Sequence, residues 1–294
     1  MDLKPYIDTV ERQKLKVLGL IVSRGDKETA RHCWTPERKR TVYSVSKSFV
    51  SVAVGMAIDE GRLRLSDRVA DAFPRVWPSG SVQAGRWEAL TLEHLLTMNM
   101  GTAEFMRPRS VKEALSRELA RDPGSSFLYD NTCTFLASAM LSAATGEKLR
   151  EYLLTRLFRP LGIPDPQWPE SDDGYTIGAT GLELTTSDMA SFGQFLLRRG
   201  NWEGKQLVSA AWLDAATRTQ VSTLPSQTKP DYNLGYGYQF WTCRHGAYRC
   251  DGRDGQFIVV LPALDAVIAV SSDEENMKPI LWAVWDCILP QLRL

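Results

Sequence analysis

Histidine is scarce in this sequence, with three residues among 294. His32, His94 and His245 lie in stretches that resemble strand edges, turns or a short Leu-rich helix, and we interpret them as structural. The Gly-x-Ser-x-Gly motif of many Ser-His-Asp hydrolases is absent. The metal-binding motifs His-Glu-x-x-His and Cys-x-x-Cys are absent as well. These absences argue against a histidine-based triad and against a metal site, and nothing in the sequence indicates a cofactor.

An excess of one charge and long apolar runs are also missing. Lys plus Arg number 35 and Asp plus Glu number 35, so nothing predicts binding to nucleic acid or to an anionic membrane. No apolar run approaches the about 20 residues that span a bilayer, and residues 1–5 lack the apolar core of a signal peptide. The five cysteines are odd in number and scattered. We interpret them as reduced thiols of a cytoplasmic protein.

The sequence does contain a Ser-x-x-Lys motif, at Ser44 and Lys47. One helical turn separates the two residues, so both side chains lie on the same helix face. A serine hydroxyl becomes a nucleophile when a nearby base takes its proton, and a desolvated lysine with a lowered pKa can be that base. A second copy, Ser226 and Lys229, precedes Pro230 in a polar stretch, and we interpret it as a chance match in a loop.

The segment after Ser44 predicts a buried helix that ends near residues 59–61. Apolar residues recur at helical spacing from Val45 to Met56 and cover most sides of that helix. Amides at its N-terminus, together with the helix dipole, would stabilise an oxyanion at Ser44. An alternative for this segment makes Ser44 or Ser46 a helix cap and Lys47 a surface residue.

Tyr129 and Asn131 form the only Tyr-x-Asn in the chain. A tyrosine near a lysine ammonium can have a lowered phenol pKa and act as a base. The asparagine amide offers a donor and an acceptor to a substrate or to the lysine. The structural alternative is a half-buried tyrosine that leads into a helix capped by Asp130 or Asn131.

Gly252 lies between two strand-like segments near the end of the chain. If this strand edge faces Ser44, the backbone N–H of Arg253 and that of Ser44 can point together at a developing oxyanion. A glycine lets another chain segment approach the backbone closely. The alternative is an ordinary hairpin that contains glycine.

The apolar pattern places strands near both ends of the chain and helices between them. Tight turns between successive strands predict an α+β fold, with an antiparallel sheet built from both termini and flanked by helices. We predict a sheet domain of residues 1–68 plus 181–294 and a mainly helical insertion of residues 69–180, with a cleft at their junction. Strands are expected over 16–23, 28–34, 236–243, 248–251, 257–261 and 266–271, and helices over 3–15, 44–59, 91–96, 111–121, 132–158, 185–199, 207–219 and 279–292.

The serine–lysine pair, the Tyr-x-Asn motif and the late glycine motif together resemble the serine β-lactamase and penicillin-binding-protein superfamily. The chain is most similar to class C β-lactamase-like esterases and 6-aminohexanoate-dimer hydrolases, over residues 19–272. This resemblance implies the β-lactamase/transpeptidase-like fold. The implied roles are a nucleophile at Ser44, a proton-transfer pair at Lys47 and Tyr129, support from Asn131, and oxyanion-hole amides at Ser44 and at Arg253, directly after Gly252.

One departure from the family pattern concerns the third motif. Cys250-Asp251-Gly252 stands where the family usually carries Lys-Thr-Gly or a His in place of the Lys, a residue that helps hold a substrate carboxylate. Arg249 and Arg253 remain as alternative anchors.

We therefore expect a cytoplasmic serine hydrolase that cleaves ester or amide bonds of small substrates through an acyl-enzyme on Ser44. No cofactor, nucleic-acid partner or membrane partner is expected. Two alternatives stay open. One is β-lactamase or D-Ala-D-Ala carboxypeptidase activity, and the other is a non-catalytic penicillin-binding-like module.

Overall fold

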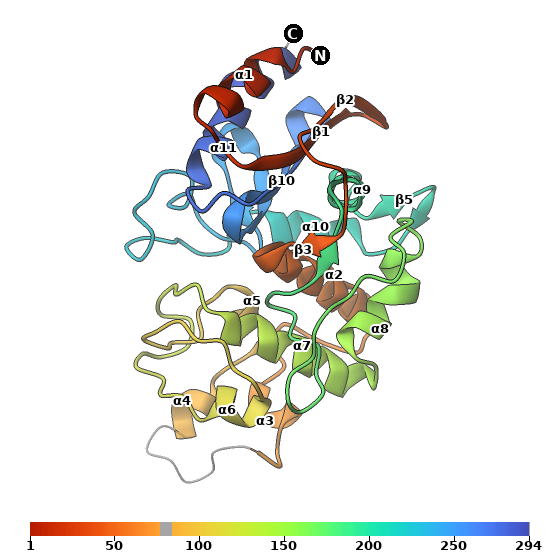
Figure 1. The fold of residues 1–294 in the computed structure, drawn as a ribbon. Helices are drawn as coiled ribbons and strands as arrows, with labels where there is room; N and C mark the ends of the chain where they lie inside the picture. The colour runs from red at the N-terminus through yellow and green to blue at the C-terminus, as the bar shows by residue number, and fades with distance from the viewer. Residues whose placement is uncertain (77–83, 294) are drawn as a thin grey trace.

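Strands from the two ends of the chain form a single six-stranded antiparallel sheet (Figure 1). The computed structural model describes residues 1–76 and 84–293. The N-terminal hairpin joins the C-terminal strands where β1 pairs with β10, and the strand order is β2-β1-β10-β9-β8-β7. The strands of this sheet are β1 (Val17–Arg24), β2 (Lys27–Cys33), β7 (Trp241–Thr242), β8 (Tyr248–Gly252), β9 (Gln256–Leu261) and β10 (Ala266–Ser272). The predicted α+β architecture is confirmed.

Strand alternation gives this sheet two buried faces. On β9, Phe257 and Val259 pack with the terminal helices, whereas Ile258 and Val260 face the opposite way, into the core around α2 (Ser46–Asp59). Successive side chains of a strand point to opposite faces of the sheet. Both faces of a sheet are apolar only when other elements cover both of them. One face is covered by α1 (Lys4–Arg12), α11 (Lys278–Ala283), η6 (Val284–Ile288) and α12 (Leu289–Leu292), and the other by α2 and α9 (Thr186–Leu197).

α2 lies at the centre of the molecule and carries Lys47. Its residues 46–57 are buried, in agreement with the apolar pattern that predicts a buried helix. A short 3-10 turn, η1 (Tyr43–Val45), precedes it. α2 packs against α7 (Asn131–Thr145) and α10 (Ala210–Thr217) as well as against the sheet.

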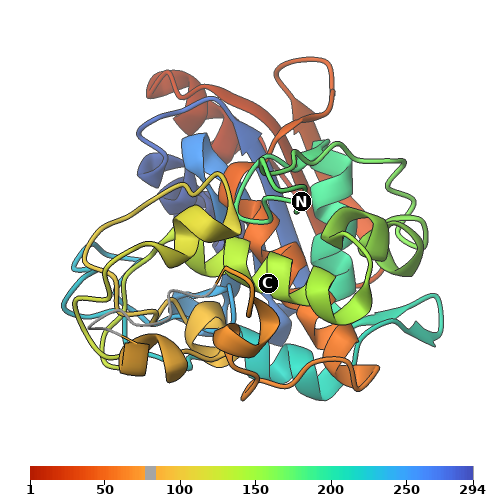
Figure 2. The ribbon, with the colours of Figure 1, turned by 90° about the horizontal axis from the view of Figure 1, so that it is seen from below.

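Most helices of the middle of the chain gather on the side of α2 away from the sheet. In Figure 2 these helices lie in front, with α2 and the sheet behind them. These helices fall within residues 69–180, the range predicted for the helical insertion. The division of the chain into two domains at these residues stays a prediction. The helices are α3 (Val69–Ala72), α4 (Ala84–Glu88), α5 (Leu92–Leu96), α6 (Val111–Leu115), α7, α8 (Leu149–Leu153) and η2 (Leu154–Phe158).

Three element predictions are wrong in extent. The helix expected over 111–121 ends at Leu115 as α6. The helix expected over 132–158 breaks at Gly146, whose left-handed φ of 75° ends α7. The strand expected over 236–243 is reduced to β7, because Gln239 turns away from the sheet with a φ of 67°. Its amide donates to the carbonyls of Leu95 and Leu96 and so ties this segment to α5 instead. Over the described residues, no helix is both long and apolar enough to cross a membrane.

Candidate active site

Ser44 lies in η1, directly before α2, and its side chain is partly exposed. Lys47 Nζ lies 3.2 Å from Ser44 Oγ, so the predicted pair is in hydrogen-bond contact. The first amides of a helix have no acceptor within that helix, and such groups can bind an anion. Tyr43, next to the serine, has a left-handed φ of 48°, which is costly for a bulky side chain. Strain of this kind is often found at functional sites.

Lys47 is buried, with 1% of its surface exposed. Its Nζ also lies 2.6 Å from Asn131 Oδ1 and 2.6 Å from the Ala179 carbonyl oxygen. Burial lowers the pKa of Lys47 to about 7, although the Asp130 carboxylate opposes this effect. A neutral amine has two N–H donors and one lone pair. Those donors match the two oxygen acceptors and leave the lone pair for the Ser44 hydroxyl.

Asn131 is held in place by the N-terminus of α7. Asp130 caps the helix and accepts a hydrogen bond from the Thr132 N–H at 3.0 Å. The buried Asp130 carboxylate also pairs with Arg117 and accepts a hydrogen bond from Thr102 Oγ1 at 3.1 Å. The predicted helix cap is therefore present, and it directs the next residue, Asn131, at Lys47.

Tyr129 contacts both the serine and the lysine. Its hydroxyl shares a hydrogen bond with Ser44, and Lys47 Nζ lies 5.2 Å from its ring centroid. The ring stacks on Trp241 of β7 with centroids 5.4 Å apart. The expectation of a lowered phenol pKa is wrong: burial raises the pKa of Tyr129 above its usual value, and the hydrogen bond with Ser44 offsets this only in part. Lys47 is thus the member of the pair whose pKa lies near neutrality.

Gly252, at the end of β8, packs against the segment that leads into Ser44. A Cβ atom on Gly252 would lie 2.4 Å from the Val42 carbonyl oxygen and 3.2 Å from Val45 Cγ2. Only glycine permits this approach, so the strand edge faces the Ser44 turn. The Arg253 side chain is exposed and lies over the Tyr43 ring, 6.0 Å from its centroid.

The third motif presents no free cation beside Ser44. Cys250 is 1% exposed and belongs to the core around α2. Arg249, on the opposite side of the strand, is fully buried, binds Asp251 at 2.7 Å and donates to the Asp231 carbonyl at 2.8 Å. Of the two alternative anchors, Arg249 is thus held by internal partners.

Two features of the site have no counterpart in the sequence prediction. The Ala179 carbonyl belongs to the backbone, which leaves no residue signature. Gly178, next to it, has a left-handed φ of 67°, and a Cβ there would lie 2.8 Å from Ser138 Cβ. Glycine at this position offers a signal, since only glycine fits both the conformation and the space.

Comparison with known proteins gives consistent matches. The Beta-lactamase family model matches residues 7–279. The chain is 29% identical to the Beta-lactamase of Escherichia coli (strain K12) over 195 residues, which are 55% of this chain and 50% of that protein. It is 24% identical to the 6-aminohexanoate-dimer hydrolase of Paenarthrobacter ureafaciens over 280 residues, or 85% of this chain and 71% of the relative. The chain thus spans about half of the first relative's length.

Solved structures share the fold. The octameric penicillin-binding protein homologue from Pyrococcus abyssi superimposes with a TM-score of 0.77 at 18% identity. The match covers 100% of this chain and 78% of that one. A likeness at this identity supports the β-lactamase/transpeptidase-like fold and nothing finer. With a family model that matches nearly the whole chain and the fold in agreement, the protein belongs to the Beta-lactamase family.

Proposed function

We propose that this chain cleaves ester or amide bonds of small substrates through an acyl-enzyme on Ser44. The observation that carries the proposal is the environment of Lys47. Its Nζ is buried with two oxygen acceptors and lies 3.2 Å from Ser44 Oγ, and its pKa is lowered to about 7. Such a lysine can take the serine proton at neutral pH without a histidine.

In the proposed acylation step, Lys47 Nζ accepts the proton of Ser44 Oγ as that oxygen bonds to the substrate carbonyl carbon. Negative charge then develops on the carbonyl oxygen. The N–H groups of Ser44 and Arg253 are the proposed donors to this oxygen, supported by the close approach of Gly252 to the Val42 carbonyl.

Collapse of the tetrahedral intermediate breaks the bond to the leaving group, which needs a proton. We assign that transfer to the Lys47 ammonium together with Tyr129, whose hydroxyl contacts Ser44. Water then attacks the acyl carbon, with Lys47 again accepting a proton. The bond between Ser44 Oγ and the acyl carbon then breaks, and the proton on Lys47 returns to Oγ, which releases the acid and regenerates Ser44.

Two alternatives are less well supported. A non-catalytic binding module has no need for a serine, lysine and tyrosine in mutual contact, and all three are present here. β-Lactamase or D-Ala-D-Ala carboxypeptidase activity would be helped by a cation in the third motif, where this chain has the buried Cys250.

Covalent labelling tests the proposal. A fluorophosphonate should add to Ser44, as mass spectrometry of the digested protein would show, and Ser44→Ala should lose both the adduct and turnover of p-nitrophenyl esters. Because the partly exposed hydroxyl has few contacts, this variant should keep its thermal stability. Ser226→Ala is the matched control for the second Ser-x-x-Lys copy and should react like the unmodified protein. An adduct on Ser226, or full activity in Ser44→Ala, would contradict the mechanism.

A further inference from the structure

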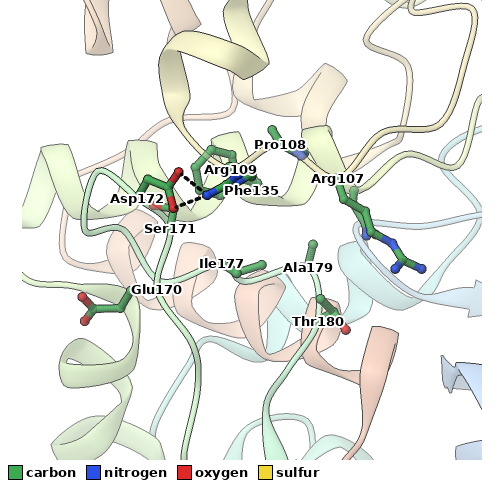
Figure 3. A pocket seen from close by; sticks show the side chains of 11 residues that line it. Arg107, Pro108, Arg109, Phe135, Glu170, Ser171, Asp172, Ile177, Ala179 and Thr180 are labelled. Carbon is green, nitrogen blue, oxygen red and sulfur yellow. Dashed lines mark hydrogen bonds and ion pairs between the residues drawn. The ribbon is translucent and has the colours of Figure 1, made fainter.

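A cavity of about 290 Å³ opens beside the proposed catalytic residues. Asn131 and Ala179, the two acceptors of Lys47, also form part of its wall. Figure 3 shows this cavity, with Phe135 on one side and Ile177 and Ala179 on the other. Small-molecule sites usually measure about 300 to 1,000 Å³, so this cavity suits one arm of a small substrate.

The position of Tyr129 indicates which arm that is. A carbonyl under attack by Ser44 carries a leaving group on one side and an acyl arm on the other. In the proposed mechanism the leaving group lies next to Tyr129, which stacks on Trp241 of β7. Tyr129 does not line the cavity, whereas Asn131 and Ala179, which bind Lys47, do. The acyl arm therefore extends into the cavity.

The cavity lining holds two arginines, Arg107 and Arg109, and two carboxylates, Glu170 and Asp172. Arg109 pairs with Asp172 at 3.1 Å, as Figure 3 shows, and Glu170 pairs with Lys148 at 2.7 Å. Arg107 also lines the cavity, and no carboxylate within residues 1–76 and 84–293 lies in ion-pair distance of it. Arg107 is therefore the lining arginine that has no ion-pair partner in the part of the chain that the structure describes.

The Arg107 side chain is placed to receive an anion. It is exposed, its guanidinium lies 5.7 Å from the Phe105 ring centroid, and Figure 3 shows it beside Ala179 and Thr180. A guanidinium presents a planar fork of donors that matches a carboxylate. The cavity wall also contains the apolar side chains of Phe135, Ile177 and Ala179.

We propose that Arg107 is a specificity-determining residue that binds a carboxylate on the acyl arm of the substrate. The substrate class is thus the monoesters or monoamides of dicarboxylic acids. This inference rests on the proposed function and narrows it to one kind of acyl group.

Paired substrates of equal chain length test the proposal. Mono-p-nitrophenyl adipate and p-nitrophenyl hexanoate both carry six-carbon acyl groups and differ in the terminal carboxylate. Arg107→Gln should lower kcat/KM for the adipate ester at least about fivefold, mainly by raising KM. This loss is modest for a charged hydrogen bond because Arg107 is exposed to solvent. The hexanoate ester should change less than about twofold, and Arg107→Lys should restore part of the loss. The preference for adipate in the unmodified protein should also weaken as salt is added.

Arg109→Gln is the matched control, because that arginine lines the same cavity but already has Asp172 as its partner. Arg109→Gln should leave the ratio of the two esters unchanged. Equal losses for both esters in Arg107→Gln, or no loss for adipate, would overturn the proposal even while Ser44 chemistry stands.

A binding experiment separates this inference from the proposed function. Adipate titrated into Ser44→Ala by calorimetry should bind more tightly than hexanoate, and adding Arg107→Gln should abolish the difference. Equal binding of both acids to Ser44→Ala would overturn the inference. If the unmodified protein turned over neither ester, the proposed function would fail, and this titration would still decide the role of Arg107.

Discussion

Lys47 Nζ meets two oxygen acceptors and one hydroxyl, and the lysine side chain is buried. With an ordinary lysine pKa, nearly all of this group would be charged at pH 7 and unable to accept a proton. Burial disfavours the charged form, and so the pKa falls to about 7.

This environment predicts the pH dependence of turnover. The reactive form of Lys47 is neutral, so kcat/KM for a neutral ester should rise with pH through about 7 and level off above it. The Arg107 cation contributes to lowering this pKa, so Arg107→Gln should move the rising limb slightly to higher pH. Initial rates between pH 5 and 9 measure both effects. A flat profile across this range would remove Lys47 as the base.

Tyr129 makes a second prediction at this scale. Tyr129→Phe keeps the ring on Trp241 but removes the hydroxyl that contacts Ser44. We expect kcat to fall by about 10²-fold, the usual scale for a lost proton-transfer group, with a smaller effect on KM. Thermal melting checks that the fold is kept. Unchanged kcat would leave Tyr129 with only a packing role.

The sequence pattern predicts which residues form the site better than it predicts their pKa values. Ser-x-x-Lys predicts contact between Ser44 and Lys47 because helix geometry alone brings the pair together. The raised pKa of Tyr129 was not predictable, since it depends on burial against Trp241, more than a hundred residues away. The Ala179 carbonyl was beyond reach as well, because every residue carries such a group.

Among the elements, β8 and η1 meet at Gly252. Replacing Gly252 by alanine would place a Cβ 2.4 Å from the Val42 carbonyl oxygen, and the two backbones must then separate. We expect a loss of about 1–3 kcal/mol in the free energy of unfolding, as for other overpacked sites. Because the shift displaces the Ser44 turn, kcat should fall by about tenfold or more.

Gly85 provides the control for that variant. A Cβ on Gly85 would meet nothing within 4 Å, and its φ lies outside the left-handed region, so Gly85→Ala should be neutral for stability and activity. Urea denaturation and ester hydrolysis measure both variants. If Gly252→Ala matched Gly85→Ala, the packing of β8 against η1 would not matter for function.

Elements with strong periodic patterns were predictable, and those that depend on distant partners were not. The buried helix at residues 46–59 and the strands β9 and β10 follow from local apolar patterns. The segment around Gln239 reads locally as a strand, but hydrogen bonds to the carbonyls of Leu95 and Leu96 hold it away from the sheet. Such a tertiary contact overrides the local preference.

At the scale of the whole molecule, the end of β8 and the cavity present different charged groups near Ser44. On the β8 side, Cys250 is buried and Arg249 is bound to Asp251. Arg253, directly after β8, is exposed but pairs with Asp254 at 3.2 Å. A carboxylate fixed to the leaving group, as in a cephalosporin, thus meets no unpaired cation among Arg249, Cys250 and Arg253, and a charge-assisted contact is worth about 1.5–3 kcal/mol. We therefore expect short esters to exceed a chromogenic cephalosporin in kcat/KM by roughly ten- to a hundredfold. Comparable rates for the two substrates would show that another group holds the carboxylate.

The order of the elements made the fold predictable as a whole. Strands at both ends and helices between them allow few compact arrangements, and an antiparallel sheet of terminal strands is the simplest. The cavity was not predictable, because its lining comes from residues 107–109, from α7 and from residues 170–180, which only the folded chain brings together.

The segment around Ala179 divides its atoms between two tasks. Its carbonyl oxygen binds the proposed base, while Ile177, Ala179 and Thr180 line the cavity. Side chains can be exchanged by mutation, but a carbonyl is common to all twenty residues. Substitutions at Ile177 or Thr180 can therefore change which acyl groups the proposed enzyme accepts. The Ala179 carbonyl that binds Lys47 is retained in such variants, provided that Gly178 keeps the backbone in place.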